Sequence, residues 1–203
     1  MNRLTLPATA LAVLALAPAA LAAPTHYSID AAHSSANFKV KHLMVSNVRG
    51  SFSDLKGSIT YDAAHPDQTV VEATIGVASV NTGNEKRDGH LKSADFFDVE
   101  KFPQMTFHSK STRKKGKQLL VTGDLTLHGV TRSVVLTVEA PGQPAKDPWG
   151  MTRIGTEAST SLDRKDYGLT WNKALESGGV LVGEDIGIDL EIELIQDAAK
   201  PAQ

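Results

Sequence analysis

Apolar and polar residues alternate with a period of two along most of the chain beyond residue 30. In a β-strand this alternation places one set of side chains on each face of a sheet. The first such segment carries Ala36, Phe38 and Val40 on one face, and Lys39 and Lys41 on the other. The alternating segments are 36–42, 55–61, 71–75, 105–109, 119–127, 134–138, 154–162 and 186–194.

Short turn-like stretches separate these segments, for example 64–67, 115–117, 128–131 and 141–144. Short connections between strands are typical of antiparallel pairing. One apolar face on nearly every strand favours a sheet that closes around a single interior. The sequence therefore predicts an all-β fold, an antiparallel closed barrel of about eight strands.

The alternation breaks at residues 43–45, which read Leu-Met-Val. Three consecutive apolar residues cannot all point to one side of a strand. The alternation resumes after Arg49 and Gly50. We therefore expect residues 43–45 to form a corner at the mouth of an apolar cavity, and Arg49-Gly50 to turn the chain back into the barrel.

Residues 84–99 depart from the strand pattern. Arg87, His90 and Leu91 recur at helical spacing. We expect one or two short helices here, placed as a lid over one end of the barrel.

The size of the residues expected inside bears on whether the barrel is filled. Aromatic residues make up 5% of the chain. An eight-stranded barrel either fills itself with side chains or holds one small ligand. The pattern alone leaves both open. The small residues expected at or next to inward positions are Ala36, Gly57, Ala73, Gly123, Ala158 and Gly187.

Residues 1–22 have the features of a secretory signal peptide, with Arg3 ahead of the apolar stretch 11–16 and small residues before the cleavage site. A membrane anchor, the alternative, needs a longer apolar stretch than this one, which Pro18 interrupts. We expect the mature chain, residues 23–203, to be a single domain in the periplasm, with release to the medium as the alternative. The chain has no cysteine, so its folding needs no disulfide.

Composition and motifs narrow the classes of function. A net formal charge of −2 argues against a nucleic-acid partner. None of the seven histidines stands in His-x-His or His-Glu-x-x-His spacing, and no thiolate is available, so we expect neither a metal nor a cofactor. No Gly-x-Ser-x-Gly motif is present, and we assign no catalytic residue.

Three arginines, Arg49, Arg87 and Arg164, each stand beside a Gly or an Asp at an expected strand or helix end. They either hold the fold through bonds to carbonyls and carboxylates, or capture the polar head of a ligand at the barrel mouth. The pattern favours the first role and leaves the second open.

A series of motifs resembles the YceI-like family, in order and over nearly the whole chain after the expected signal peptide. These motifs are YSIDAAHS (27–34), FKVKH (38–42), VRGSF (48–52), RDGHLKSADFFDV (87–99), FPQMTF (102–107), GDLTLHGVTR (123–132), WG (149–150) and RKDYGLTW (164–171).

The resemblance implies a lipocalin-like barrel that holds a long isoprenoid lipid, such as a polyprenyl chain or a quinone tail, in an interior tunnel. It also implies a secreted periplasmic protein with no established catalytic residue and no stable membrane insertion. Fatty-acid derivatives are a further ligand class, and a homodimer is left open. The apolar lining expected from the matched motifs is Phe38, Val40, Met44, Phe52, Phe97, Met105, Phe107 and Trp171. The polar rim expected is His42, Arg49, Arg87, His90 and Arg164.

Two rival functions remain at this point. An enzyme acting on an isoprenoid or quinone requires ionisable residues inside the barrel, with His42, Arg87 and His90 the first candidates. A ligand-free stress protein of the envelope would instead carry an apolar patch on the outside of the barrel.

Overall fold

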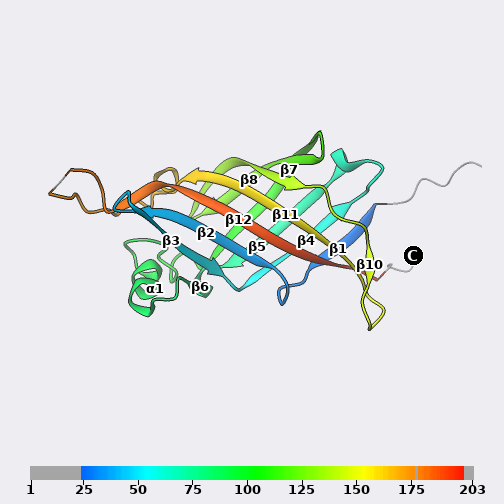
Figure 1. Ribbon diagram of the computed structural model, residues 1–203, viewed down its shortest axis with the longest axis horizontal. Helices are drawn as coiled ribbons and strands as arrows, with labels where there is room; N and C mark the ends of the chain where they lie inside the picture. Colours follow the sequence, from blue (N-terminus) through cyan, green and yellow to red (C-terminus); the bar gives the residue numbers. More distant parts are fainter. Residues whose placement is uncertain (1–23, 177, 199–203) are drawn as a thin grey trace, which may run out of the picture.

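The alternating segments form the strands of one antiparallel sheet, which closes into a barrel in the computed structural model (Figure 1). The structure describes residues 24–176 and 178–198, so the expected signal peptide lies outside the described residues. The strands are β1 (Thr25–Ile29), β2 (Ser35–His42), β3 (Ser46–Phe52), β4 (Leu55–Tyr61), β5 (Val70–Gly76), β6 (Val80–Asn81), β7 (Gln104–Lys115), β8 (Gln118–Leu127), β9 (Val130–Glu139), β10 (Ala145–Lys146), β11 (Thr152–Asp163) and β12 (Val182–Gln196). The other elements are the 3-10 turns η1 (Pro66–Gln68), η2 (Val77–Ser79) and η3 (Arg164–Tyr167) and the helix α1 (Glu85–Lys92).

Eight strands close the barrel, in the hydrogen-bonded order β12-β1-β4-β5-β7-β8-β9-β11. The ring closes between β11 and β12, which pair from Arg153↔Ile195 to Asp163↔Asp185. The other edge of β12 pairs with β2 along most of its length and with β1 near its end. β2, β3 and β6 therefore extend the sheet beyond the ring at one end. This architecture confirms the antiparallel barrel predicted from the sequence.

The two ends of the barrel differ in what covers them. At the end that carries β1, Tyr27, Leu119 and Leu194 are almost completely buried and pack in apolar clusters. At the opposite end lie α1 and the residues that follow it (Figure 1). The interior is therefore filled with side chains at the first end and covered by a helical segment at the second.

The chain reverses between β2 and β3 at Leu43 and Met44, and not at Arg49-Gly50 as the pattern predicted. Leu43 and Met44 adopt left-handed conformations, with φ of 52° and 60°. Arg49 and Gly50 lie within β3, where Gly50 is the register partner of Phe38. Gly50 leaves room for that ring to pack closely against β3. From the sequence alone, a glycine with this role cannot be distinguished from a glycine in a turn.

The structure gives the detail of two other expectations. Residues 84–99 contain one helix, α1, whose N-cap Asn84 accepts a hydrogen bond from the Arg87 backbone N–H at 3.0 Å. Gly187 faces outward, where the side chain of Lys39 covers it, because the inward positions of β12 fall on its even-numbered residues. No helix within the described ranges has the length and apolar character needed to cross a bilayer.

Candidate ligand-binding cavity

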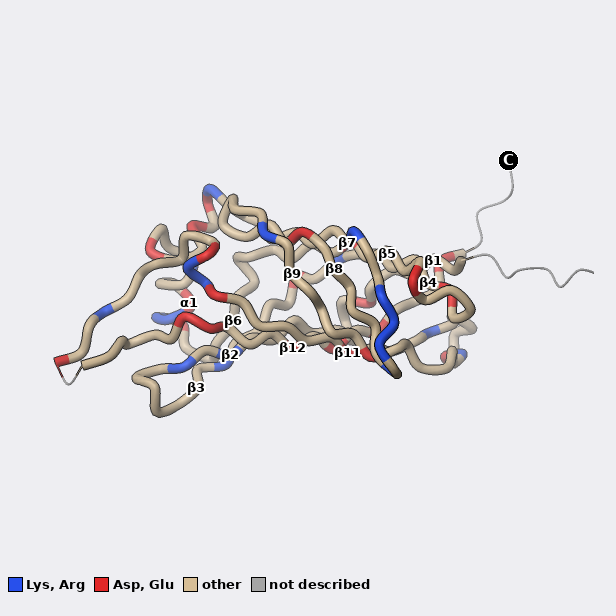
Figure 2. Tube along the Cα trace, turned by 90° about the horizontal axis from the view of Figure 1, so that it is seen from above, with Lys and Arg blue, Asp and Glu red and all other residues tan. Residues whose placement is uncertain are grey.

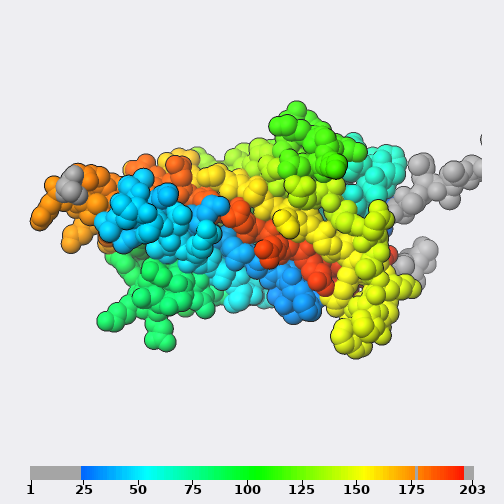
Figure 3. All heavy atoms as spheres, in the orientation of Figure 1, coloured from blue at the N-terminus to red at the C-terminus, as the bar shows by residue number. Residues whose placement is uncertain are grey.

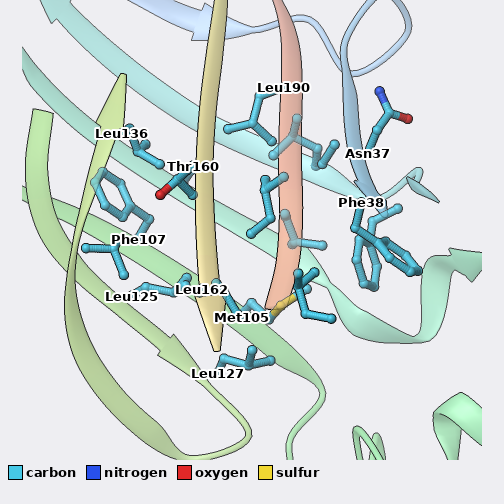
Figure 4. A pocket seen from close by; sticks show the side chains of 18 of the residues that line it. Asn37, Phe38, Met105, Phe107, Leu125, Leu127, Leu136, Thr160, Leu162 and Leu190 are labelled. Atoms are coloured by element: carbon cyan, nitrogen blue, oxygen red, sulfur yellow. The ribbon is translucent and has the colours of Figure 1, made fainter. Parts of the chain in front are cut away.

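The barrel holds an apolar cavity of about 240 Å³ between its filled end and α1 (Figure 4). Every strand of the eight-stranded ring contributes at least one lining residue. Figure 4 shows Leu125, Leu136 and Leu190 among the side chains around the space, from β8, β9 and β12. The period-two alternation of these strands thus produces a continuous apolar interior.

Aromatic side chains form the wall of the cavity toward α1. The ring centroids of Phe38 and Phe52 lie 5.6 Å apart, and those of Phe52 and Phe97 lie 5.8 Å apart in an edge-to-face arrangement. Such tilted and edge-to-face contacts are favourable geometries for aromatic pairs. Phe97 is held there because its backbone N–H donates to Leu91 O at 2.9 Å.

Arg87 fixes α1 to the segment that precedes it and does not line the cavity. Its Nε donates to Thr82 Oγ1 at 2.8 Å, and its Nη2 donates to the Thr82 carbonyl at 2.9 Å. The Thr82 hydroxyl in turn donates to Asp88 Oδ1 at 2.5 Å. This network ties the helix to the chain just before it, so Arg87 has the fold-holding role that the sequence favoured.

His90 belongs to an aromatic cluster behind the cavity wall. Its ring lies edge-on to Phe96 and Trp171, with centroids 5.0 and 4.8 Å away. Its Nε2 is paired with Asp95 Oδ2 at 2.9 Å. Phe96 lines the cavity, so His90 and Trp171 support the wall from outside.

Arg164 is the one ionisable side chain among the described residues that line the cavity. It is 3% exposed, and its guanidinium donates to the carbonyls of Gly183 at 2.8 Å, Leu169 and Val182. Burial lowers the pKa of Arg164. Its donors are directed at backbone carbonyls, so it joins η3 to the start of β12.

The hydroxyl of Tyr167 is buried and has no hydrogen-bond partner within the described part of the chain. Its side chain packs in the apolar cluster that also contains Met105, Leu127 and Leu169, three residues that line the cavity. Burial raises the pKa of Tyr167, since the apolar surroundings disfavour the phenolate.

The sequence-predicted residues fall into three groups by position. Met44 and Trp171 lie outside the lining: Met44 is in the exposed β2–β3 turn, and Trp171 is behind Phe96. Of the expected rim, His42, Arg49, Arg87 and His90 do not line the cavity either, and Arg49 is exposed on the outer face of β3. The expected residues that do line it are Phe38, Val40, Phe52, Phe97, Met105, Phe107 and Arg164.

Many lining residues were not named as site residues from the sequence. Leu136, Thr160 and Leu190 point inward from strands that were predicted, so the alternation already carried their signal. Leu91 and Phe96 had no such signal, because their contact with the cavity depends on where α1 and the following turn dock.

A second cluster of ionisable residues lies at the filled end. Atoms of Asp30, His33 and Glu193 come close enough together to suggest a cation site. However, Arg153 Nη1 donates to Asp30 Oδ2 and to Glu193 Oε1, both at 2.5 Å, and its Nε donates to Asp147 Oδ2 at 2.8 Å. The guanidinium therefore supplies the positive charge, and the cluster is an ion-pair network that joins β1, β11 and β12.

Comparison with known proteins places these features in context. The sequence profile of the YceI-like domain matches residues 27–194. The UPF0312 protein of Photorhabdus laumondii is 43% identical over 159 residues, 78% of this chain and 82% of that protein.

Two solved structures share the fold. The YCEI protein of Campylobacter jejuni has a TM-score of 0.65 at 35% identity, covering 78% of this chain and 90% of that one. A polyisoprenoid binding domain from Saccharophagus degradans has a TM-score of 0.61 at 20% identity, covering 84% of this chain and 98% of that one.

Proposed function

Because this chain belongs to the YceI-like family, we propose that its barrel binds a long apolar isoprenoid lipid, such as a polyprenyl chain or a quinone tail. In this proposal the protein is a periplasmic carrier or storage protein for that lipid. The polyisoprenoid binding domain of Saccharophagus degradans, which has the same fold, supports this ligand class.

The observation that carries the proposal is the apolar cavity of about 240 Å³. Protein interiors are close-packed, so a space of this size is unusual in a filled core. An engineered apolar cavity of about 150 Å³ stays dry and takes up benzene. A chain of isoprene units suits this lining because its carbon atoms can contact apolar side chains along its whole length.

The energetics allow binding without a polar anchor. Each buried methylene contributes about 0.8 kcal/mol. The lost freedom of the ligand and the ordering of its chain offset part of this gain. Tight binding is therefore expected only for a chain that fills the cavity.

The lining supports binding rather than catalysis on the lipid. Acid–base chemistry needs an ionisable group within reach of the substrate. Arg164, the one such group among the described lining residues, is already bonded to three carbonyls. His42, Arg87 and His90, which an enzyme of this kind would have used first, are not part of the lining.

A pair of neighbouring variants tests the site. Ala158 is buried and lines the cavity, whereas Ser159 beside it is exposed on the outer face of β11. We expect Ala158→Leu to weaken the binding of geranylgeraniol, an isoprenoid alcohol, at least about tenfold, because three added carbons displace ligand carbons. Ser159→Leu should bind it like the unchanged protein in isothermal titration calorimetry after delipidation. Equal binding by Ala158→Leu would place the ligand elsewhere.

The compartment is proposed from residues 1–22 alone. Cell fractionation followed by N-terminal sequencing of the mature protein tests it, with residue 23 as the expected first residue. Recovery of the uncleaved chain in the cytoplasmic fraction would contradict it. The proposal involves no nucleic-acid partner and leaves the oligomeric state open.

A further inference from the structure

The hairpin of β2 and β3 ends in three apolar side chains that project into solvent. Leu43, Met44 and Val45, which we call the β2–β3 tip, are 39%, 57% and 80% exposed. Figure 3 shows this hairpin at the same end of the molecule as α1 and the segment before β12. The apolar run that breaks the sequence pattern is therefore an outer feature of the fold.

The tip goes against the local preferences of a hairpin turn. Val45 N–H donates to His42 O at 3.1 Å, and Leu43 and Met44 between them both have positive φ. Such two-residue turns favour Asn-Gly, since both central residues are left-handed. Leu and Met here add backbone strain and expose apolar surface at once. Strain of this kind is concentrated at functional sites.

The stem of the hairpin is basic. Residues 31–53 contain no Asp or Glu, and Lys39, Lys41 and Arg49 lie on the outer face of β2 and β3, because Phe38 and Val40 between them line the cavity. In Figure 2 the Lys and Arg positions of this hairpin are blue along the tube. Lys39 pairs with Asp189 at 3.1 Å. Lys41 and Arg49 are exposed and form no ion pair within the described residues.

The tip is continuous with the wall of the cavity. Leu43 N–H donates to Leu181 O at 2.9 Å, which joins the tip to the segment before β12. Val40 and Val182, the lining residues nearest to this bond in sequence, belong to the two strands that meet there. The same segment carries one further cation, Lys173, and one anion, Glu176.

We propose that the β2–β3 tip docks on an anionic lipid bilayer, with its apolar side chains in the interfacial region and the basic stem against the headgroups. An apolar edge with flanking cations is the arrangement that binds such surfaces. Docking turns the α1 end of the cavity toward the bilayer. The purpose of this contact, exchange of the lipid between barrel and membrane, rests on the proposed function.

The opposite end of the barrel is the natural alternative, because Trp149 there is 80% exposed. Several carboxylates lie near it. Trp149 N–H donates to Asp147 Oδ1, and Asp147 is joined through Arg153 to Glu193. A groove that includes Glu193 is lined also by Glu139, Glu157 and Glu191. The β7–β8 turn at this end adds the cations Lys114, Lys115 and Lys117. Charges of both signs thus meet here, and Trp149→Ala tests this end as the alternative.

The test is flotation of the protein with vesicles of phosphatidylethanolamine and phosphatidylglycerol. Leu43→Asn combined with Met44→Gly removes the apolar side chains and installs residues that suit the turn, so it should melt no lower than the unchanged protein. We expect at least a tenfold loss of vesicle partition from this double variant, because it removes two large apolar side chains from the interface.

The basic stem is tested separately. Lys41→Gln and Arg49→Gln should each reduce vesicle partition about fivefold, and added salt should weaken binding by the unchanged protein. Trp149→Ala should bind normally.

Docking is overturned if the unchanged protein does not float with anionic vesicles, if the double variant floats as well as it does, or if Trp149→Ala is the variant that loses binding. Binding of geranylgeraniol by the same proteins separates the two proposals. A double variant that binds the isoprenoid but not vesicles supports docking with the lipid function intact. Tip-dependent flotation by a protein that never binds isoprenoid supports docking and contradicts the proposed function.

Discussion

The ring of Phe38 lies across Gly50, its register partner on β3, so closely that a methyl group on Gly50 would stand 2.4 Å from Phe38 Cζ. Cγ2 of Thr82 would be 2.8 Å away from the same methyl group. Phe38 therefore has its place in the aromatic wall of the cavity because residue 50 has no side chain.

From this contact we expect Gly50→Ala to push the Phe38 ring out of its position and to destabilise the protein by about 1–3 kcal/mol, the usual cost of overpacking. Chemical denaturation measures this change. Gly155→Ala is the control, because the nearest atom to an added methyl there is Ile192 O at 4.0 Å. The control should be unchanged or up to about 1 kcal/mol more stable. A Gly50→Ala protein as stable as the control would mean that the ring moves freely.

Removing the Tyr167 hydroxyl should stabilise the barrel. The hydroxyl lacks a partner within the described chain and sits in an apolar cluster. A buried polar group without a hydrogen bond costs about 1–3 kcal/mol. Tyr167→Phe should therefore raise the melting temperature, whereas Tyr61→Phe, at a partly exposed position, should change it little. A lower melting temperature for Tyr167→Phe would show that the hydroxyl has a partner in solution.

Acid should weaken the filled end of the barrel through Asp30. The imidazole of His33, which faces Asp30 Oδ2 at 2.9 Å, and then Arg153 lower the pKa of Asp30 from 3.8 to about 2. The folded-state pKa lies below the unfolded one. The stabilisation from Asp30 is therefore complete above about pH 4 and is lost as the pH falls toward 2. We expect the stability difference between the unchanged protein and Asp30→Asn, from urea denaturation at a series of pH values, to shrink over this interval. A difference that stays constant with pH would contradict the role of the ionised carboxylate.

Arg164 should stabilise the folded protein rather than bind the ligand. Arg164→Lys leaves the Leu169 and Gly183 carbonyls without their guanidinium donors, and we expect a loss of about 2 kcal/mol or more. Lys165→Gln, which breaks only an exposed pair with Glu184, should cost at most about 1 kcal/mol. Thermal denaturation of both variants measures the contrast. Normal stability with weakened isoprenoid binding in Arg164→Lys would assign Arg164 to the ligand instead.

The barrel was predictable because alternation determines which side of each strand is buried. Ile186, Ile188 and Leu190 were read correctly as one face, and all three line the cavity. β1 does not stand out in the sequence, because its alternation of Tyr27 and Ile29 with His26 and Ser28 covers only five residues and its pairing with β4 and β12 is long-range.

The site was less predictable where it depends on packing between distant segments. Leu91 and Phe96 contact the cavity through the docking of α1, and Met44 was assigned to the wall because apolar character alone does not distinguish a lining residue from an exposed turn. The break in the alternation at residues 43–45 does mark a distinct part of the fold, but this part is the exposed β2–β3 tip and not a wall of the cavity.

The central claim is that an isoprenoid lipid occupies the barrel, and the most direct measurement is mass spectrometry of protein purified from the cells that naturally produce it. Native spectra should show a complex heavier than the polypeptide. Extraction with organic solvent should release a polyprenyl or quinone species and leave the bare chain. A native mass equal to that of the polypeptide, with no isoprenoid in the extract, would contradict the account.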